Sequence, residues 1–441
     1  SSSATTPRTM AMQVDNDAVK AVASRTWAPG SWRSYECCQM AVYEDQQELK
    51  TVLDKLSRVP PLVPAVEVDA LVAELAIAAR GESFIVQGGD CAERFIDCEG
   101  ERLDAQLQML VQMGAIVTAS TGKPCVRIAR IAGQYGKPRS KPTETVAGFG
   151  EIYSFKGDNI NGYDPNDRKW DPQRLLLGYW HSAATLNYLR GLQMADDFGS
   201  EMLNTMDISY LSGSEHFGSW SAVAATAKTT PATPGIFTAH EAMQLDLEEA
   251  LTRRVGDKGH YNLSAHMVWI GDRTRQLLGG HVEYFRGIKN PIGCKVGPSM
   301  GAEELKQLVK ILNPSNVEGK LVLITRYGVS KVEELLPPHI KAVQEAGIHV
   351  VWQADGVHGN TVTASNKLKT RAWADVVGEC AKAVAIHKAH GSVLAGVHLE
   401  MTGQKSVTEC TGGCVAISEE MLPNNYETYC DPRLNYGQAI E

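Results

Sequence analysis

Features that mark several protein classes are missing from this sequence of 441 residues. No run approaches the 18 or so uninterrupted apolar residues of a membrane-spanning helix, and no apolar core of a secretory signal is present. Ten cysteines are too few for a disulfide-stapled domain, which favours a reducing compartment. The 43 basic and 51 acidic residues give a net charge of −8, so neither nucleic acid nor an anionic membrane is an expected partner.

Nucleotide-binding motifs are also missing. The glycine-rich segments GGDCAE and KGDNING match neither a P-loop nor a dinucleotide-binding fingerprint. What is present is an ordinary globular composition, 43% hydrophobic and 21% charged, in a chain long enough to bury a large core. Residues 1–13 are rich in Ser and Thr and contain no acid, which fits the remnant of a transit peptide as well as an expression remnant. We therefore expect the plastid stroma or the cytoplasm, and not secretion.

From about residue 81, short β-rich runs alternate with amphipathic helices. Eight such units in series predict a (β/α)8 TIM barrel over residues 81–441, preceded by an extension, residues 1–80, that serves oligomerisation or regulation. The loop 141–172 is too long and polar for an ordinary connection, which is typical of a functional loop. The predicted strands are Phe84–Gln87, Val126–Ile131, Asn204–Leu211, His266–Ile270, Ile292–Val296, Leu321–Thr325, Ile348–Gln353 and Gly396–Met401.

Amphipathic patterns predict the helices of the chain. Two lie in the extension and the others follow the strands; the pattern over 274–288 is weakened by Gly279-Gly280. The final residues, NYGQAIE, read as the first turn of a helix. The predicted helices are Tyr43–Leu56, Val66–Arg80, Glu101–Ser120, Leu175–Leu192, His240–Arg254, Thr274–Ile288, Ala302–Leu312, Val332–Gly347 and Ala372–His390.

Side chains that commonly bind metals follow the strands at the end where TIM barrels hold their active sites. Cys91 follows the first strand, His358 the seventh, Glu400 lies in the eighth, and Asp431 comes later. Sulfur, nitrogen and oxygen together suit a divalent transition metal, Mn²⁺, Co²⁺, Fe²⁺ or Zn²⁺. The four residues lack any compact metal motif, so the alternative is a buried thiol, a loop histidine and two unrelated acids. Asp355 is a candidate to orient His358.

Six cations occupy the same strand ends. Together they predict a site for a small polyanion with one or two phosphates and a carboxylate, because Arg forks and Lys ammonium groups bind such oxygens. The alternative is a set of solvated surface charges. Glu241 and Asp272 are candidates for acid–base work or for holding the cations. The six are Arg130, Lys137, Arg139, Arg273, Lys295 and Arg326.

Many segments between about residues 26 and 435 resemble, in order, the class II (plant-like) 3-deoxy-D-arabino-heptulosonate-7-phosphate (DAHP) synthases. They include FIVQGGDCAERF, RIAGQYGKPRS, KGDNINGY, WQADGVHGNT, GVHLEMTGQ and CDPRLN. The resemblance implies a barrel with inserted helices and a transferase of the shikimate pathway to aromatic amino acids. Its reaction joins phosphoenolpyruvate, D-erythrose 4-phosphate and water in a metal-dependent aldol-type condensation that yields DAHP and phosphate.

The resemblance also implies roles for single residues. The metal, Mn²⁺ or Co²⁺ before Zn²⁺ or Fe²⁺, would be held by Cys91, His358, Glu400 and Asp431. Phosphoenolpyruvate would meet Arg130, Arg273, Lys295 and Arg326, with Lys137 nearby. Erythrose 4-phosphate would meet Arg139, Ser140 and the KGDNIN loop, through Lys156, Asp158 and Asn161; Glu241 completes the substrate-binding set. The residues expected to act in the chemistry are Lys137, Asp272, Lys295 and His358.

Partners and alternatives follow from the same resemblance. We expect a homodimer or homotetramer, aromatic amino-acid effectors and chorismate mutase as a candidate partner. The resembling proteins carry Glu where Asp272 stands and Arg where Lys156 stands, which favours a second hypothesis, condensation with another sugar phosphate in specialised metabolism. A third hypothesis is a non-catalytic regulatory partner. Finally, Cys430 adjoins Asp431, so a Cys91–Cys430 disulfide that consumes a metal ligand is a candidate redox switch.

Overall fold

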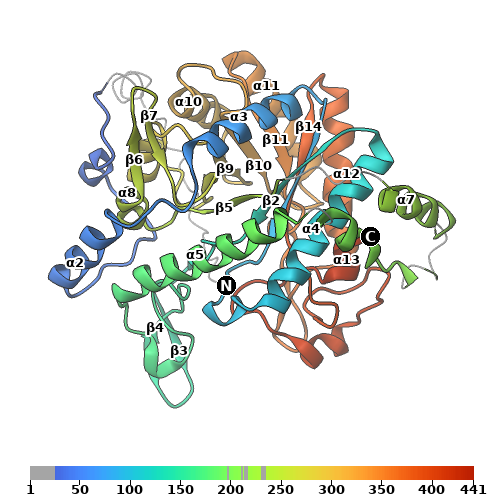
Figure 1. Ribbon diagram of the computed structural model, residues 1–441, viewed down its shortest axis with the longest axis horizontal. Coiled ribbons are helices and arrows are strands. Elements are labelled where there is room, and N and C mark those ends of the chain that lie inside the picture. Colours follow the sequence, from blue (N-terminus) through green and yellow to red (C-terminus); the bar gives the residue numbers. More distant parts are fainter. Residues whose placement is uncertain (1–24, 196–197, 210–211, 213–216, 230–234) are drawn as a thin grey trace, which may run out of the picture.

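The computed structural model describes residues 25–195, 198–209, 212, 217–229 and 235–441. The Ser/Thr-rich start lies outside them. Eight parallel strands close into a barrel in the order β1-β14-β11-β10-β9-β8-β5-β2, with helices around it (Figure 1), which confirms the predicted fold class. The barrel strands are β1 (Phe84–Gly89), β2 (Cys125–Arg130), β5 (Phe237–Glu241), β8 (Met267–Ile270), β9 (Ile292–Val296), β10 (Leu321–Thr325), β11 (Val351–Ala354) and β14 (Leu394–Glu400).

Seven predicted strands coincide with barrel strands, and the third prediction is wrong. Residues 210–211 of the predicted strand Asn204–Leu211 lie outside the described part, and Asn204 ends a helix, α6 (Phe198–Asn204). The third barrel strand is β5, after a second inserted helix, α7 (Phe217–Thr229). The sequence of β5 is FTAHE, and the periodicity did not predict this strand because its polar end resembles the start of a helix. The predicted helix His240–Arg254 is wrong for the same reason. That range holds the end of β5, a short helix and part of a hairpin.

The principal predicted helices are present. The barrel strands are buried on both faces, as in sheets that helices cover on the outside. The predicted loop 141–172 contains a small antiparallel hairpin, β3 (Thr143–Val146) and β4 (Gly150–Tyr153), that projects from the barrel (Figure 1). The helices are α2 (Gln46–Leu56), α3 (Ala65–Ala79), α4 (Gly100–Thr121), α5 (Gln173–Gln193), α8 (Leu245–Ala250), α9 (Gly280–Phe285), α10 (Ala302–Leu312), α11 (Val332–Ala346), α12 (Trp373–Ala389) and α13 (Tyr436–Ile440).

Minor strands and short 3-10 turns complete the described elements. A second hairpin, β6 (Thr252–Val255) with β7 (Gly259–Asn262), follows α8, and the two-residue strands β12 (Val362–Thr363) and β13 (Lys369–Thr370) pair just after β11. The predicted terminal helix turn is α13, which Asn435 caps through its side chain. No helix in the described ranges is both long and apolar enough to cross a membrane.

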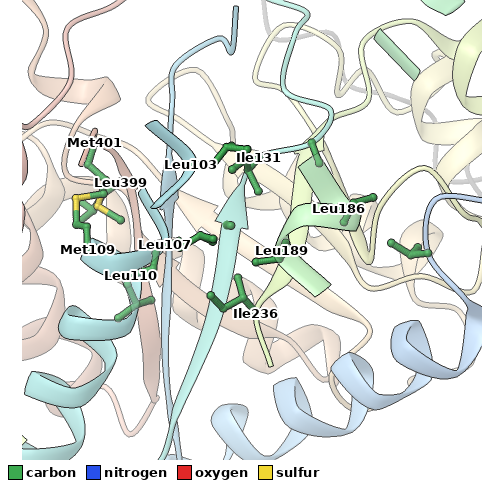
Figure 2. Packing of buried hydrophobic residues seen from close by; sticks show 14 of the residues in the cluster. Leu103, Leu107, Met109, Leu110, Ile131, Leu186, Leu189, Ile236, Leu399 and Met401 are labelled. Carbon is green, nitrogen blue, oxygen red and sulfur yellow. The ribbon is translucent and has the colours of Figure 1, made fainter. Parts of the chain in front are cut away.

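Packing of α4 and α5 against the barrel forms the largest apolar cluster. Figure 2 shows Leu107 and Leu110 of α4 near β2, with Leu186 and Leu189 of α5 on the other side of that strand. Met401, just after β14, joins the same cluster. The α4 helix ends at Gly122, whose positive φ of 67° closes the last turn without a side-chain clash. This cluster holds the strands whose C-terminal ends carry the site described below.

One helix of the extension, α3, closes the N-terminal end of the barrel, and the predicted role of the extension in oligomerisation or regulation stays a prediction. Leu71, Leu75 and Ala78 of α3 are fully buried in one cluster with barrel-interior residues such as Ile85 and Ile324. The N-terminal end of the barrel is therefore plugged by an element that precedes β1 in sequence. The opposite, C-terminal end is left open for a site.

Leu75→Ala is expected to lower the free energy of unfolding by about 2–5 kcal/mol, since a buried leucine removed from a packed core leaves a cavity. Urea denaturation followed by circular dichroism would measure the loss. Val66→Ala on the same helix is the matched control, because Val66 is 70% exposed and such surface changes stay within about 0.5 kcal/mol. Equal stability of the two variants would contradict the conclusion that α3 packs into the N-terminal end of the barrel.

Candidate active site

A cavity of about 640 Å³ opens among the loops that follow the barrel strands. Seven Lys or Arg residues line it together with five Asp or Glu residues, so its walls carry an excess of positive charge although the whole chain is acidic. Residues from the loops after β2, β8, β10 and β11 meet here, together with the last residue of β5. The predicted site residues among the lining are Lys137, Arg139, Ser140, Glu241, Asp272, Arg273, Lys295, Arg326, His358 and Asp431.

The metal-ligand candidates meet at the floor of this cavity. One ligand atom each from Cys91, Glu400 and Asp431 lies within 4.8 Å of the other two. His358, the fourth predicted ligand, places Nε2 2.9 Å from Oε1 of Glu400. Strand pairing aligns Gly89 of β1 with Glu400 of β14, which brings the Cys91 loop to the glutamate although 309 positions separate them in sequence. Three of the four predicted donors therefore form one cluster, which His358 joins through its contact with Glu400.

A cation already sits against three of these donors. The ammonium Nζ of Lys137 lies 2.8 Å from Sγ of Cys91, 3.3 Å from Oε1 of Glu400 and 3.0 Å from Oδ2 of Asp431. Burial opposes ionisation of Asp431, yet the Lys137 ammonium lowers the pKa of this carboxyl below its ordinary value. Burial raises the pKa of the Cys91 thiol. The negative charge of the cluster therefore comes from its carboxylates, since the pKa of Glu400 is lowered as well as that of Asp431.

The second ring nitrogen of His358 is held as predicted. Nδ1 of His358 lies 2.7 Å from Oδ2 of Asp355, a fully buried carboxylate that also accepts the backbone N–H groups of Val357 and His358. The ammonium of Lys295 contacts the same carboxylate. Such an acid fixes the orientation and tautomer of a ligating imidazole. Both ring nitrogens of His358 therefore contact carboxylates in this arrangement.

Arg130 lies beneath the cavity and does not line it. Its guanidinium donates to the carbonyls of Asp90 and Cys91, contacts Oε1 of Glu400 at 3.1 Å, and lies 2.7 Å from Nε2 of His398. All three side-chain nitrogens therefore bond protein groups. In this structure Arg130 supports the metal-ligand cluster from below.

The other cations differ in how they are held. Asp272 bonds Arg275 at 3.0 Å and Arg326 at 3.2 Å, one through each carboxylate oxygen, so it holds arginines in place. Arg273 is exposed, and among the described residues its guanidinium bonds only the hydroxyl of Ser140, at 3.3 Å. Arg273 thus keeps most of its donors for a bound anion, whereas the geometry of Asp272 favours a positioning role.

Three predicted substrate residues of the 141–172 loop do not line the cavity. Nζ of Lys156 donates to the carbonyl of Gln39 at 2.6 Å, Asp158 accepts the N–H of Phe95 at 2.7 Å, and the amide of Asn161 bonds the carbonyls of Ser154 and Arg168. These residues hold the loop against its surroundings. The sequence motif did not reveal this, because the partners of Lys156 and Asp158 lie 117 and 63 residues away and those of Asn161 are backbone carbonyls.

Position 157 of this loop requires a glycine for a steric reason. Its φ is +112°, and a Cβ at this position would lie 1.6 Å from the carbonyl oxygen of Tyr135. The close approach lets the N–H of Lys137 donate to the carbonyl of Lys156 at 2.7 Å. The loop therefore positions the backbone of Lys137 while its own polar side chains point elsewhere.

Two buried side chains at the site were missed by sequence reasoning. Glu93 accepts the N–H groups of Ala132, Gly133 and Gln134 and so holds the loop that carries Lys137. An acid among glycines and apolar residues in GGDCAE was a usable signal for it. Arg371 bonds Glu400 at 2.7 Å, and nothing in the local sequence marks it.

The redox hypothesis concerns two cysteines that lie near each other. The thiol of Cys91 accepts the N–H of Asp431, the residue after Cys430, at 3.3 Å. Interaction with Cys91 lowers the pKa of Cys430, and neither cysteine is in a disulfide. Whether oxidation joins them stays a prediction.

Comparison with known proteins identifies the family. The model of the class-II DAHP synthetase family matches residues 27–441. Phospho-2-dehydro-3-deoxyheptonate aldolase of Neurospora crassa is 42% identical over 451 residues, covering 94% of this chain and 92% of the relative. The enzyme of that name from Streptomyces coelicolor is 40% identical over 430 residues, covering 94% and 95%. The match over nearly the whole chain shows that this protein belongs to the class-II DAHP synthetase family.

Proposed function

We propose that this chain condenses phosphoenolpyruvate with D-erythrose 4-phosphate and water, giving DAHP and phosphate, in the cavity described above. DAHP synthase activity, the first step of the shikimate pathway, follows from the family, and the metal dependence and the two substrates are the proposal. The observation that carries it is a cation-lined cavity, lined also by His358 and Asp431, beside a buried group in which Cys91, Glu400 and Asp431 meet and His358 contacts Glu400. Anion recognition and a Lewis acid are the two things that this condensation requires.

The donor set fits a divalent transition metal. A thiol, an imidazole and two carboxylates suit Mn²⁺, Co²⁺, Fe²⁺ or Zn²⁺ better than Mg²⁺ or Ca²⁺. The contacts of the Lys137 ammonium with Cys91, Glu400 and Asp431 support the same conclusion, since these donors are arranged around a cation. When bound, the metal would polarise the aldehyde oxygen of erythrose 4-phosphate.

The chain's own cations would bind and orient the anions. Lys295 and Arg326 face the cavity from β9 and the end of β10 and suit the phosphate and carboxylate of phosphoenolpyruvate. Arg139 and Ser140, from the loop after β2, suit the second phosphate. Asp272 would keep Arg326 in place through their 3.2 Å contact.

Two residues are placed to handle protons. Lys137 contacts the donor cluster, so its ammonium could give a proton to the oxygen formed from the aldehyde. Glu241 lines the cavity, and its Oε1 has no hydrogen-bond partner among the described residues. A carboxylate oxygen without a partner is suited to accept a proton from the water that adds to the substrate.

Activity is expected to fall at alkaline pH. Burial lowers the pKa of Lys295 to about 8, although the carboxylate of Asp355 opposes the shift. Below about pH 8 Lys295 carries the charge that binds an anion, and above it the charge is lost. Therefore kcat/KM for phosphoenolpyruvate should decrease by up to about tenfold per pH unit above that value. Lys295→Arg keeps its charge at high pH and should move the decrease of kcat/KM to higher pH. A decrease at the same pH as in the wild type would contradict the assignment to Lys295.

A coupled assay tests the proposal. Metal-loaded protein receives phosphoenolpyruvate and erythrose 4-phosphate while phosphate release and heptulosonate formation are followed together. Equal amounts of both products, abolished by a chelator, would support it. Phosphoenolpyruvate binding without turnover would favour another sugar phosphate, and no binding of either substrate would favour a regulatory role.

A further inference from the structure

Arg371 is an arginine buried out of contact with the cavity. Its side chain has no exposed surface, and it is absent from the cavity lining. It follows β13 and precedes α12, between the segments that carry His358 and Glu400. Its own backbone is fixed, since its carbonyl accepts the N–H of Thr411 at 2.9 Å. A buried cation of this kind is stable only when its donors are matched by acceptors.

Each acceptor of Arg371 belongs to a segment that bears a metal-ligand candidate. Nε donates to Oγ1 of Thr361 at 2.8 Å, three residues beyond His358. Nη1 donates to the carbonyl of Pro432, next to Asp431. Nη2 donates to Oε2 of Glu400 at 2.7 Å. One guanidinium therefore ties together three of the four ligand-bearing segments.

Arg371 also determines which oxygen of Glu400 faces the other donors. Oε2 is taken by Arg371, whereas Oε1 lies 2.9 Å from Nε2 of His358 and 3.3 Å from Nζ of Lys137. With Oε2 held, Glu400 presents a single oxygen to the cluster. A lysine could not do the same, because one ammonium lacks the planar fork that reaches three separate acceptors.

We propose that Arg371 is a positioning residue that sets the metal affinity of the Cys91–His358–Glu400–Asp431 cluster, by orienting Glu400 and holding the His358 and Asp431 loops. The inference rests on the metal site of the proposed function. Arg371 does not line the cavity, so it would not contact a substrate bound there. Loss of such outer contacts typically lowers metal affinity by 10–100-fold.

The test measures metal binding directly. Full-length protein, stripped of metal with a chelator, is titrated with Mn²⁺ while free Mn²⁺ is followed by electron paramagnetic resonance. A parallel titration with Co²⁺ records the visible absorption bands. Arg371→Lys is expected to bind Mn²⁺ about 10-fold or more weakly and to shift the Co²⁺ bands. Arg168→Lys is the matched control: Arg168 is also buried, but the partners of its side chain all lie within residues 144–163, so its metal affinity should equal that of the wild type.

A second pair of variants covers the case in which Arg371→Lys does not fold, as judged by circular dichroism. Thr361→Val removes the hydroxyl that accepts from Nε at 2.8 Å and that lies 3.5 Å from the carbonyl of Val357, and it should weaken Mn²⁺ binding by roughly two- to fivefold. Thr361→Ser keeps the hydroxyl and both contacts, so it should bind like the wild type. Wild-type affinity in a folded Arg371→Lys variant would overturn the inference, as would equal affinities of the Thr361 pair.

A failure of the proposed function is distinguishable from a failure of the inference about Arg371. Wild-type protein that binds Mn²⁺ without forming DAHP would count against the function, yet the comparison between Arg371→Lys and the wild type would still decide the role of Arg371. Wild-type protein that binds neither Mn²⁺ nor Co²⁺ would overturn both.

Discussion

Cys91→Ser is expected to reduce bound Mn²⁺ from about one equivalent to a small fraction and to lower kcat by at least about a thousandfold. A serine hydroxyl is close to the thiol in shape, but it stays protonated near neutral pH and is a poor ligand for a transition metal. The three remaining donors, Glu400, Asp431 and His358, would keep their carboxylate and imidazole atoms together. Metal analysis after gel filtration and the coupled assay would measure the two losses.

The matched control is Cys98→Ser. Cys98 lies seven residues from Cys91 in sequence, but its thiol contacts Thr185 and the carbonyl of His181 and has no contact with the donor cluster. Metal content and kcat of this variant should stay within about twofold of the wild type. Metal retained at full stoichiometry in Cys91→Ser would show that the thiol is not a ligand.

Lys295→Met is expected to lower kcat/KM for phosphoenolpyruvate by about a thousandfold, which corresponds to about 4 kcal/mol. Methionine fills similar space without the charge, so the anion loses a buried cation. Asp355 would in addition lose one of its two ionic partners, since only His358 remains. Removing one member of a buried pair typically costs about 3–5 kcal/mol.

Steady-state kinetics with each substrate varied in turn would separate the effects. KM for phosphoenolpyruvate should rise much more than KM for erythrose 4-phosphate if Lys295 binds the former. Lys289→Met is the control, because Lys289 is exposed and precedes β9 at the end of the strand opposite the cavity. An unchanged kcat/KM in Lys295→Met would remove this residue from the site.

Sequence periodicity was sufficient for most of the barrel, and its failure at the third strand has a physical cause. Strands such as Leu321–Thr325 are buried on both faces and read as continuous apolar runs. Phe237–Glu241 places His240 against the buried carboxylate of Glu248 and Glu241 in the cavity wall. Polar residues with such partners break the apolar pattern, so the strand could not be distinguished from the start of a helix.

The amino-acid sequence by itself determined the (β/α)8 pattern, predicted the four donor candidates that the barrel brings near one another, and identified most of the cations that line the cavity. This was possible because parallel strands in a closed barrel bring their C-terminal ends together whatever the loops between them do. Only the tertiary structure decided that α3 plugs the barrel, that Arg130 is buried beneath the donors, that Asn161 bonds its own loop, and that Arg371 holds Glu400. The physical reason is that a buried polar group takes whichever partner the fold brings near, seven residues away for Asn161 and 270 residues away for Arg130 and Glu400.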